Sequence, residues 1–455
     1  MPMNKGFNED TIAAIATPVG VGAISVIRVS GNKTFEVVDT FFRGRKRLSE
    51  SPSHTIHYGK ITDPEGTLID DVLVSLFRNP NSYTGEDSIE ISSHGSPLIT
   101  NRIMGILLGK GVRLAEPGEF TKRAFLNGKL DLAQAEAVAD VINSRTSAAL
   151  RGARNQLDGL LSSKVVSLRS SLLNISSLIE LELDFAEEEI KFLPAEEIVS
   201  KIDALVAEMD ALLNTYSFGK VIRDGINVAL VGKPNVGKSS LLNYLLKESR
   251  AIVSEIPGTT RDVISEEIYS DGILFRLYDT AGIRLTEDAI EKEGVRRSRQ
   301  AVKDADIVLF ISDVDSGFSP DLHAELSSLT GEDRVLRVTN KIDLKEQAPP
   351  AADVYISSKT GEGIHELLEM MRRKVAGTAN YTENTAVISS LRHYKALESS
   401  RQSLLSARDS LLMNMSGEFI SVDLRNAGEN LGEIIGTVTT DDILNNIFAK
   451  FCIGK

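Results

Sequence analysis

The stretch GKPNVGKS at residues 232–239 decides the fold of this chain. It matches the phosphate-loop pattern G-x-x-x-x-G-K-[ST], in which glycines let backbone N–H groups converge on phosphates. The apolar run 228–231 predicts a buried strand before the loop, and residues 241–246 predict a helix after it. Lys238 is expected to reach the β- and γ-phosphates, and Ser239 to hold Mg²⁺. The alternative, a chance glycine-rich turn, is disfavoured by this strand–loop–helix context.

Four further motifs follow in the order of a guanine-nucleotide-binding domain: GTTRD at 258–262, DTAG at 279–282, NKID at 340–343 and SSK at 357–359. Thr260 is expected to complete the magnesium shell. The carboxylate of Asp343 can accept hydrogen bonds from N1–H and the 2-amino group of guanine, a pair of donors that adenine lacks. Together the motifs predict a GTPase domain with a doubly wound, mostly parallel α/β sheet and the nucleotide at its carboxyl edge.

The residues expected to contact GTP, GDP or the ions beside them come from all five motifs and from the segment before GTTRD. They are Asn235, Val236, Gly237, Lys238, Ser239, Ser240, Ser254, Glu255, Ile256, Pro257, Gly258, Thr259, Thr260, Asp279, Thr280, Ala281, Gly282, Asn340, Lys341, Asp343, Ser357, Ser358 and Lys359.

The water-orienting glutamine that many switch GTPases carry after DTAG is replaced by Ile283, which cannot hold water. Glu291, further along, is a candidate for that role, and a surface carboxylate is the alternative. Arg261 and Arg284 could serve as arginine fingers, but neither is singled out. Asn235 offers another solution, because its side-chain oxygen could bind a monovalent cation beside the phosphates. Oxygens of Ser254, Ile256 and Thr259 could complete that site.

Composition limits the class of protein. The 455 residues carry a net charge of −13, so RNA binding would need a local basic patch or a basic partner. No apolar run is long enough for a membrane span, and the N-terminus lacks the apolar core of a signal peptide. The single cysteine, Cys452, excludes an intrachain disulfide and fits a reducing compartment, so we expect a cytoplasmic protein.

The pattern along the chain predicts a multidomain protein. Residues 1–120 indicate an α+β domain, with strands at 11–16, 23–29, 72–77 and 88–91 and a helix at 98–108. Amphipathic helical repeats fill residues 121–218 and 380–455, on both sides of the GTPase segment 219–379. Because such helices need a common core, we expect one discontinuous all-α helical domain with the α/β GTPase domain inserted in it.

Motifs outside the GTPase segment resemble those of the MnmE (TrmE) family of tRNA modification GTPases, over essentially the whole chain. They are TIAAIATP at 11–18, IRVSG at 27–31, YTGED at 83–87, PGEF at 117–120, RAFLNGKLDLAQAEA at 123–137 and FCIGK at 451–455. The resemblance implies a potassium-activated GTPase whose water-orienting glutamate falls on Glu291 and whose potassium ligands fall on the set around Asn235.

The resemblance also implies partners and a second cofactor. Members act with the flavoprotein MnmG, as a heterotetramer, and install an aminomethyl or carboxymethylaminomethyl group at C5 of the wobble uridine of certain tRNAs. The N-terminal domain forms a homodimer and binds 5-formyl- or 5,10-methylene-tetrahydrofolate. Arg28, Glu90 and Lys129 fall on the family's folate contacts, with Lys455 added from the C-terminus. Cys452 falls on a suspected participant, and a buried small apolar side chain is its alternative reading.

A switch GTPase that docks on ribosomal RNA is the competing function. It would need a basic RNA-binding module beside the GTPase domain, and the acidic composition argues against one.

Overall fold

The computed structural model describes residues 10–184, 194–249, 265–279, 299–344, 352–376 and 385–455. The chain forms two compact units. Unit 1 comprises residues 1–139, 157–169 and 428–455, and unit 2 comprises residues 140–156 and 170–427. In the described parts of the chain, no helix is both long and apolar enough to cross a bilayer. The expected fold class, an α+β N-terminal part, helical segments and an α/β GTPase domain, is confirmed.

Unit 1 is built on a seven-stranded sheet with the order β3-β4-β5-β6-β2-β1-β7. Its strands are β1 (Ile12–Ile15), β2 (Ile24–Ser30), β3 (Phe42–Gly44), β4 (Thr55–Thr62), β5 (Leu68–Phe77), β6 (Ser88–His94) and β7 (Arg113–Leu114). All pairs are antiparallel except β1 with β7. Apolar residues of α1 (Thr34–Asp39) and α2 (Pro97–Gly109) complete a buried core on one face.

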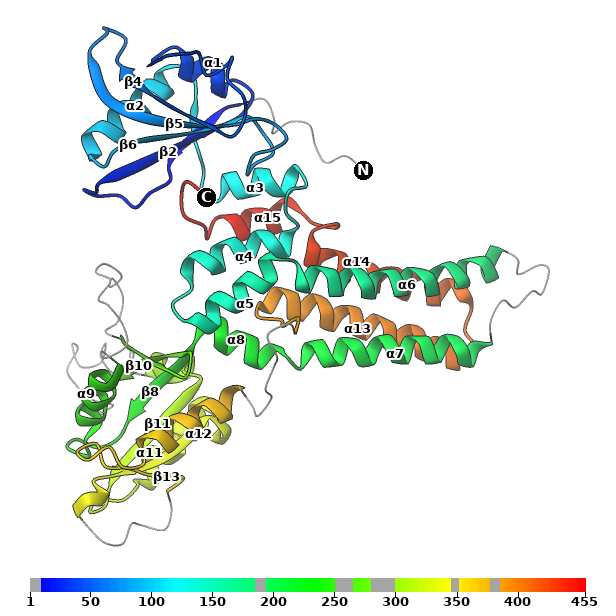
Figure 1. The fold of residues 1–455 in the computed structure, drawn as a ribbon. Coiled ribbons are helices and arrows are strands. Elements are labelled where there is room, and N and C mark those ends of the chain that lie inside the picture. The colour runs from blue at the N-terminus through cyan, green and yellow to red at the C-terminus, as the bar shows by residue number, and fades with distance from the viewer. Residues whose placement is uncertain (1–9, 185–193, 250–264, 280–298, 345–351, 377–384) are drawn as a thin grey trace. The chain divides into compact units, whose positions relative to one another are not determined.

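The C-terminus of the chain folds back into unit 1. Helices α3 (Glu119–Leu126), α4 (Leu132–Asn143) and α15 (Asp441–Phe448) share an apolar cluster. Its buried members are Phe125, Leu132, Ala135, Leu444, Phe448 and Phe451. Figure 1 shows α15 (red) lying beside α3, and the Lys122 ammonium donates to the Asn445 side chain at 3.0 Å. The last residues of the chain are thereby held next to the N-terminal sheet.

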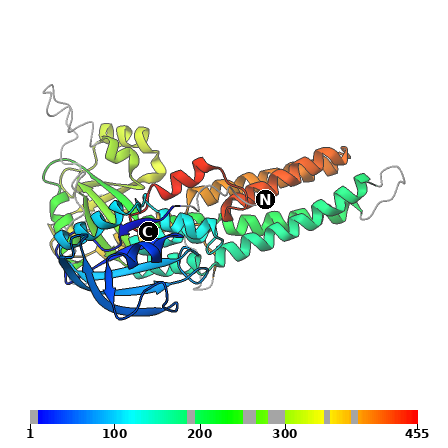
Figure 2. The ribbon, with the colours of Figure 1, turned by 90° about the horizontal axis from the view of Figure 1, so that it is seen from above.

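Six further helices in the described part of the chain contain the remaining apolar repeats. They are α5 (Ser147–Leu157), α6 (Leu160–Asp184), α7 (Ala195–Leu213), α8 (Tyr216–Asp224), α13 (Leu391–Leu412) and α14 (Gly417–Ile435). In unit 2, α7 and α13 run side by side (Figure 1), joined by Arg401 and Asp210. Figure 2 shows α13 (orange) from above. The amphipathic repeats predicted for residues 121–218 place one apolar face of α7 in the core, because its residues Ile198, Ile202, Leu205, Met209 and Leu212 are each at most 4% exposed.

The GTPase part of unit 2 has a six-stranded sheet with the order β13-β12-β11-β8-β10-β9. Its strands are β8 (Ile226–Val231), β9 (Ser265–Ser270), β10 (Ile273–Asp279), β11 (Ile307–Asp313), β12 (Val335–Asn340) and β13 (Val354–Tyr355). All neighbours are parallel except β9 with β10. This is the mostly parallel sheet that the motifs predict.

Helices cover both faces of that sheet. Apolar residues of α9 (Lys238–Ser249) and α12 (Ile364–Ala376) pack with Val228 and Leu230 of β8. Residues of α11 (Pro320–Thr330) pack with the alternate residues, Ala229 and Val231. Strand β8 is therefore buried on both faces, which explains its continuous apolar run.

Candidate functional site

The phosphate loop joins β8 to α9 and depends on two glycines. A Cβ atom at Gly237, whose φ is +97°, would lie 2.2 Å from Nδ2 of Asn340. A Cβ atom at Gly232 would lie 2.2 Å from the carbonyl oxygen of Ile311. Asn235, between them, adopts a left-handed φ of +64°. The glycines are thus required by close packing of the loop against β11 and β12 as well as by phosphate access.

The side chain of Lys238 folds back over the phosphate loop. Its Nζ atom donates to the carbonyl oxygens of Gly232, at 2.7 Å, and Lys233, at 3.0 Å. Burial lowers the pKa of Lys238, while the nearby carboxylate of Asp279 acts in the opposite direction. The ammonium is therefore held at the mouth of the loop by weak carbonyl partners that an anionic phosphate can replace.

Asp279 ends β10 and carries a buried Oδ1 atom without a hydrogen-bond partner among the described residues. An unpartnered buried carboxylate oxygen is costly unless a cation or its bound water satisfies it. Ser239 lies in the first turn of α9, as the motif requires. These two residues fit a magnesium site.

Asn340 connects three of the nucleotide motifs. Its Nδ2 atom donates to the carbonyl oxygen of Val236 at 3.0 Å, which ties it to the phosphate loop. Its Oδ1 atom accepts from the backbone N–H groups of Lys341, at 2.8 Å, and Ser358, at 3.0 Å. The side chain is 1% exposed, so these bonds are made in a low-dielectric setting.

Lys341 follows with a left-handed φ of +65°, and its ammonium binds Oδ2 of Asp313 at 2.8 Å. Burial alone would raise the pKa of Asp313. Hydrogen bonds from Lys341 and Ser316 outweigh burial and hold the pKa well below its ordinary value. Asp313 thus fixes the aliphatic stem of Lys341 beside the expected base position. The sequence reading missed Asp313, although an aspartate at the end of a buried strand is a signal that could have found it.

Asp343 is oriented by the last motif. Its Oδ1 atom accepts from the hydroxyl of Ser357 at 2.7 Å. That hydroxyl oxygen in turn accepts from the backbone N–H groups of Lys359 and Thr360. Asp343 itself is exposed, so its other carboxylate oxygen is accessible to a ligand.

Many residues predicted for this site lie outside the described residues. They are Ser254, Glu255, Ile256, Pro257, Gly258, Thr259, Thr260, Arg261, Thr280, Ala281, Gly282, Ile283, Arg284 and Glu291.

A second cluster lies in unit 1, where β2 and β6 place Arg28 directly opposite Glu90. The Nε and Nη2 atoms of Arg28 donate to Oε1 of Glu90 at 3.0 and 2.8 Å, and Nη1 donates to the carbonyl oxygen of Gly454 at 3.3 Å. The guanidinium also lies 5.5 and 5.6 Å from the ring centres of Tyr83 and Phe120. The contacts with Gly454, Tyr83 and Phe120 join residues that are far apart in sequence, and no local pattern predicts them.

The other residues assigned to this cluster lie around it. Burial lowers the pKa of Lys455, Arg28 acts in the same direction, and Glu90 and Cys452 oppose them, so Lys455 is close to all three. Cys452 is exposed, not a buried small apolar side chain. Lys129 lies instead against Gly85 of the YTGED segment, where a Cβ atom would be 3.3 Å from its Cε atom.

Several motif residues are structural. The guanidinium of Arg123, 2% exposed, binds carboxylates of Asp10, Glu86 and Glu119 at 2.6, 3.2 and 2.9 Å. Burial lowers the pKa of Arg123, but these carboxylates raise it overall. The network joins YTGED and PGEF to the helix that follows them, which explains the charged residues in those motifs.

Comparison with known proteins gives consistent matches. The family model for the MnmE helical domain matches residues 132–452, and that for the GTP-binding protein TrmE N-terminus matches residues 11–129. A protein of Carboxydothermus hydrogenoformans named tRNA modification GTPase MnmE is 44% identical over 98% of this chain and 100% of its own. One of Cytophaga hutchinsonii with the same name is 43% identical over 98% of each chain. The crystal structure of an Aquifex aeolicus Era variant bound to GDP and AlF₄⁻ covers 40% of this chain and 67% of its own, with 27% identity and a TM-score of 0.27.

Proposed function

The chain belongs to the MnmE family of tRNA modification GTPases, and we propose that it acts with the flavoprotein MnmG on the wobble uridine of certain tRNAs. It is a GTP hydrolase of tRNA modification that binds GTP and GDP. In the proposal, hydrolysis drives installation of an aminomethyl or carboxymethylaminomethyl group at C5, with a reduced folate as one-carbon donor.

The hydrogen bonds of Asn340 to Val236 and Ser358 are the main support for the proposed guanine-nucleotide site. One buried amide holds the phosphate loop and the two base-recognition loops in a single arrangement. Asp343 then offers carboxylate lone pairs to the two adjacent donors of guanine. Lys238 exchanges its carbonyl partners for phosphate oxygens, where it neutralises charge that develops on the γ-phosphate side.

We propose that Ser239 and Thr260 would hold Mg²⁺, and that the buried, unpartnered Oδ1 atom of Asp279 would contribute to the same site. Asn235, Ser254, Ile256 and Thr259 would hold K⁺. The cations supply positive charge next to the transferring phosphate. The left-handed turn at Asn235 supports the second site, because it exposes the side chain at the crest of the loop. Glu291 is proposed to orient the attacking water.

Replacement of Na⁺ by K⁺ at fixed ionic strength tests the cation proposal. GTP turnover should rise by about tenfold or more, as expected when a charge-stabilising group is added at the phosphates. An Asn235→Ala variant should lose that difference. Equal rates in both salts, or a potassium response that survives in Asn235→Ala, would refute the site.

The folate proposal rests on Arg28 and Glu90. The two bonds that Arg28 donates to Glu90 both end on Oε1, so Oε2 can accept from the N–H edge of a pterin. In the proposal, Lys455 and the Cys452 thiol lie beside this pair, and Lys129 contributes from its position against Gly85. A Glu90→Gln variant should weaken binding of 5-formyl-tetrahydrofolate by about tenfold in calorimetry, since a charge-assisted bond becomes neutral. Unchanged affinity would contradict this assignment.

A homodimer through the N-terminal part and a heterotetramer with MnmG complete the proposal. One face of the sheet supports the homodimer, because it exposes Ile56, Tyr58 and Leu73, which are 67%, 66% and 48% accessible. We also propose a cytoplasmic location, which the single cysteine favours.

Reconstitution tests the whole proposal. The purified chain, MnmG, GTP, a reduced folate and an unmodified substrate tRNA should yield the C5-substituted uridine in nuclease digests analysed by mass spectrometry. If the C5-substituted uridine forms equally well without this chain, the proposal is wrong.

A further inference from the structure

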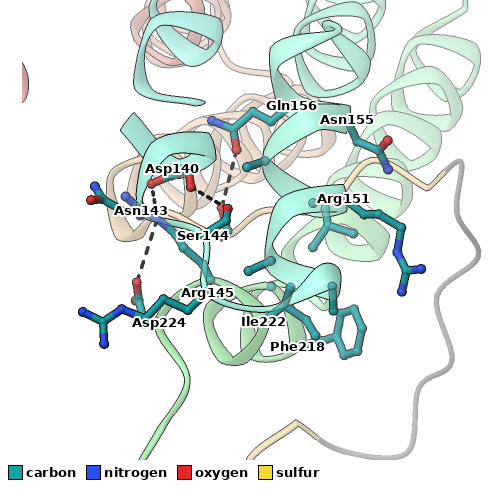
Figure 3. Close-up of a pocket in the computed structure, with 18 of the residues that line it drawn as sticks. Asp140, Asn143, Ser144, Arg145, Arg151, Asn155, Gln156, Phe218, Ile222 and Asp224 are labelled. Carbon is teal, nitrogen blue, oxygen red and sulfur yellow. Dashed lines mark hydrogen bonds and ion pairs between the residues drawn. The ribbon is translucent and has the colours of Figure 1, made fainter. Parts of the chain in front are cut away.

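Unit 2 contains a cleft of about 820 Å³ that lies apart from the nucleotide loops (Figure 3). It is lined by the end of α4, by α5 and α8, by Arg276 of β10 and by residues 385–389. The lining part of α5 includes four small residues, Ala148, Ala149, Gly152 and Ala153, which leave the space open. A Cβ atom at Gly152 would have no neighbour closer than Ile222 at 3.7 Å.

The cleft has a local positive charge in an acidic chain. Residues 144–157 include three arginines and no aspartate or glutamate, although the whole chain carries −13. Arg145 and Arg276 both pair with Glu267. Arg151 is exposed and makes no hydrogen bond or ion pair within the part of the chain that the structure describes. Arg151 therefore holds the charge that remains available to an anion.

The fourth arginine of the cleft contributes little. Arg223 lies 2.9 Å from Asp140 and 3.9 Å from Asp224, so its charge is balanced by neighbouring carboxylates.

Beside Arg151 the cleft offers groups of two other kinds. Asn143, Asn155 and Gln156 carry amides, which can both donate and accept hydrogen bonds. Arg151 and Asn155 project from the same side of α5 in Figure 3, one helical turn apart. Phe218 and Ile222 supply an apolar wall. A cation, amides and an apolar wall match the phosphate, the polar edge and the flat face of a nucleotide.

We propose that this cleft receives an unpaired nucleotide of the RNA substrate, with Arg151 on its phosphate and the amides of α5 near its base. The proposal rests on the proposed function, which makes tRNA the substrate. An RNA strand is favoured over a small metabolite because the cleft is open at Arg151 and Arg145, whose side chain is 41% exposed. Proteins that read RNA take up splayed-out single-stranded bases in this way.

A fluorescence anisotropy titration of the full chain with a labelled, unmodified substrate tRNA tests this site. Arg151→Glu should weaken affinity by about tenfold and reduce the slope of log K against log salt by about one, as expected for one lost phosphate contact. Arg151→Lys should retain most of the affinity. Arg425→Glu is the matched control, because Arg425 is an exposed arginine of α14 away from the cleft, and it should bind like the wild type.

Equal binding by Arg151→Glu and wild type would overturn the inference, and so would an equal loss in Arg425→Glu, which would indicate general electrostatics. The thermal midpoint of each variant verifies folding, and Arg151→Gln replaces Arg151→Glu if that variant unfolds. The outcomes separate from the proposed function. A wild type that supports no modification in the reconstitution defeats the function, whereas a modifying wild type with an unaffected Arg151→Glu defeats only this site.

Discussion

A single side chain, the amide of Asn340, organises the nucleotide site at the scale of residues. Its two bonds to Val236 and Ser358 cross between loops that are about a hundred and about twenty residues away in sequence. The motif NKID predicts that Asn340 contacts the nucleotide. In the structure Asn340 has a second role, because it connects the phosphate loop to the loop at 357–359. Bonds between distant loops could not be predicted, because local spacing holds no information about them.

Truncation of this amide should therefore disturb phosphate and base binding together. Asn340→Ala leaves the Val236 carbonyl and the Ser358 N–H without their partner, at a cost of about 1–3 kcal/mol. We expect GDP affinity in calorimetry to fall by about tenfold or more. Asn101→Ala, an exposed asparagine of α2, should bind GDP like the wild type. An Asn340→Ala variant with wild-type affinity would contradict the role of the amide.

Base selection should depend on Asp343 alone. In Asp343→Asn, one carboxylate acceptor becomes an N–H donor, which no longer matches the 2-amino group of guanine but matches the 2-carbonyl group of xanthine. Competition between GTP and XTP should move by about a hundredfold toward XTP, the order expected when a site built to hydrogen-bond one group meets another. An unchanged preference would show that another residue reads the base.

At the scale of elements, a strand could be predicted where its apolar residues mark the buried core. Strand β8 was predicted because both of its faces are buried. Strand β4 was missed because Ile56 and Tyr58 lie on its exposed side, so its apolar residues do not mark the core. Strand β9, SEEIYS, was missed because it is a polar edge strand. Edge and exposed strands carry a weaker signal than central ones.

Strand β9 also links the GTPase sheet to the segment that precedes α5, through the ion pair of Arg145 and Glu267. It begins directly after residues 250–264, which include the predicted switch loop. Its partner β10 ends at Asp279 and contributes Arg276, which lies 3.5 Å from the same carboxylate. Glu267 of β9 therefore also binds β10, and both strands adjoin segments that are predicted to contact the phosphates.

Loss of this carboxylate should uncouple α5 from the bound nucleotide. Hydrogen exchange of residues 144–157 should differ between GDP and a GTP analogue in the wild type, and the difference should disappear in Glu267→Gln. Glu266→Gln removes the neighbouring charge on β9 and should keep the wild-type difference. The same exchange difference in Glu267→Gln as in the wild type would rule out coupling through this pair.

For the whole molecule, the sequence predicts the fold class and the nucleotide motifs but not the long-range closures. Unit 1 brings residue 454 onto residue 28, and its apolar cluster joins α3 and α4 to α15. Such contacts between the two ends of a chain depend on tertiary packing, and no local sequence pattern predicts them. The acidic composition did predict that RNA binding needs a local basic patch, and the arginines of residues 144–157 are the candidate.

The central claim is that GTP hydrolysis in this chain drives modification of the wobble uridine. The most direct measurement is mass spectrometry of tRNA from cells whose own gene is deleted and replaced by wild type, Lys238→Ala or Arg425→Glu. Wild type and Arg425→Glu should restore the C5 group, and Lys238→Ala, which cannot hold the β- and γ-phosphates, should leave the uridine bare. Fully modified tRNA in the cells that carry Lys238→Ala would contradict the account.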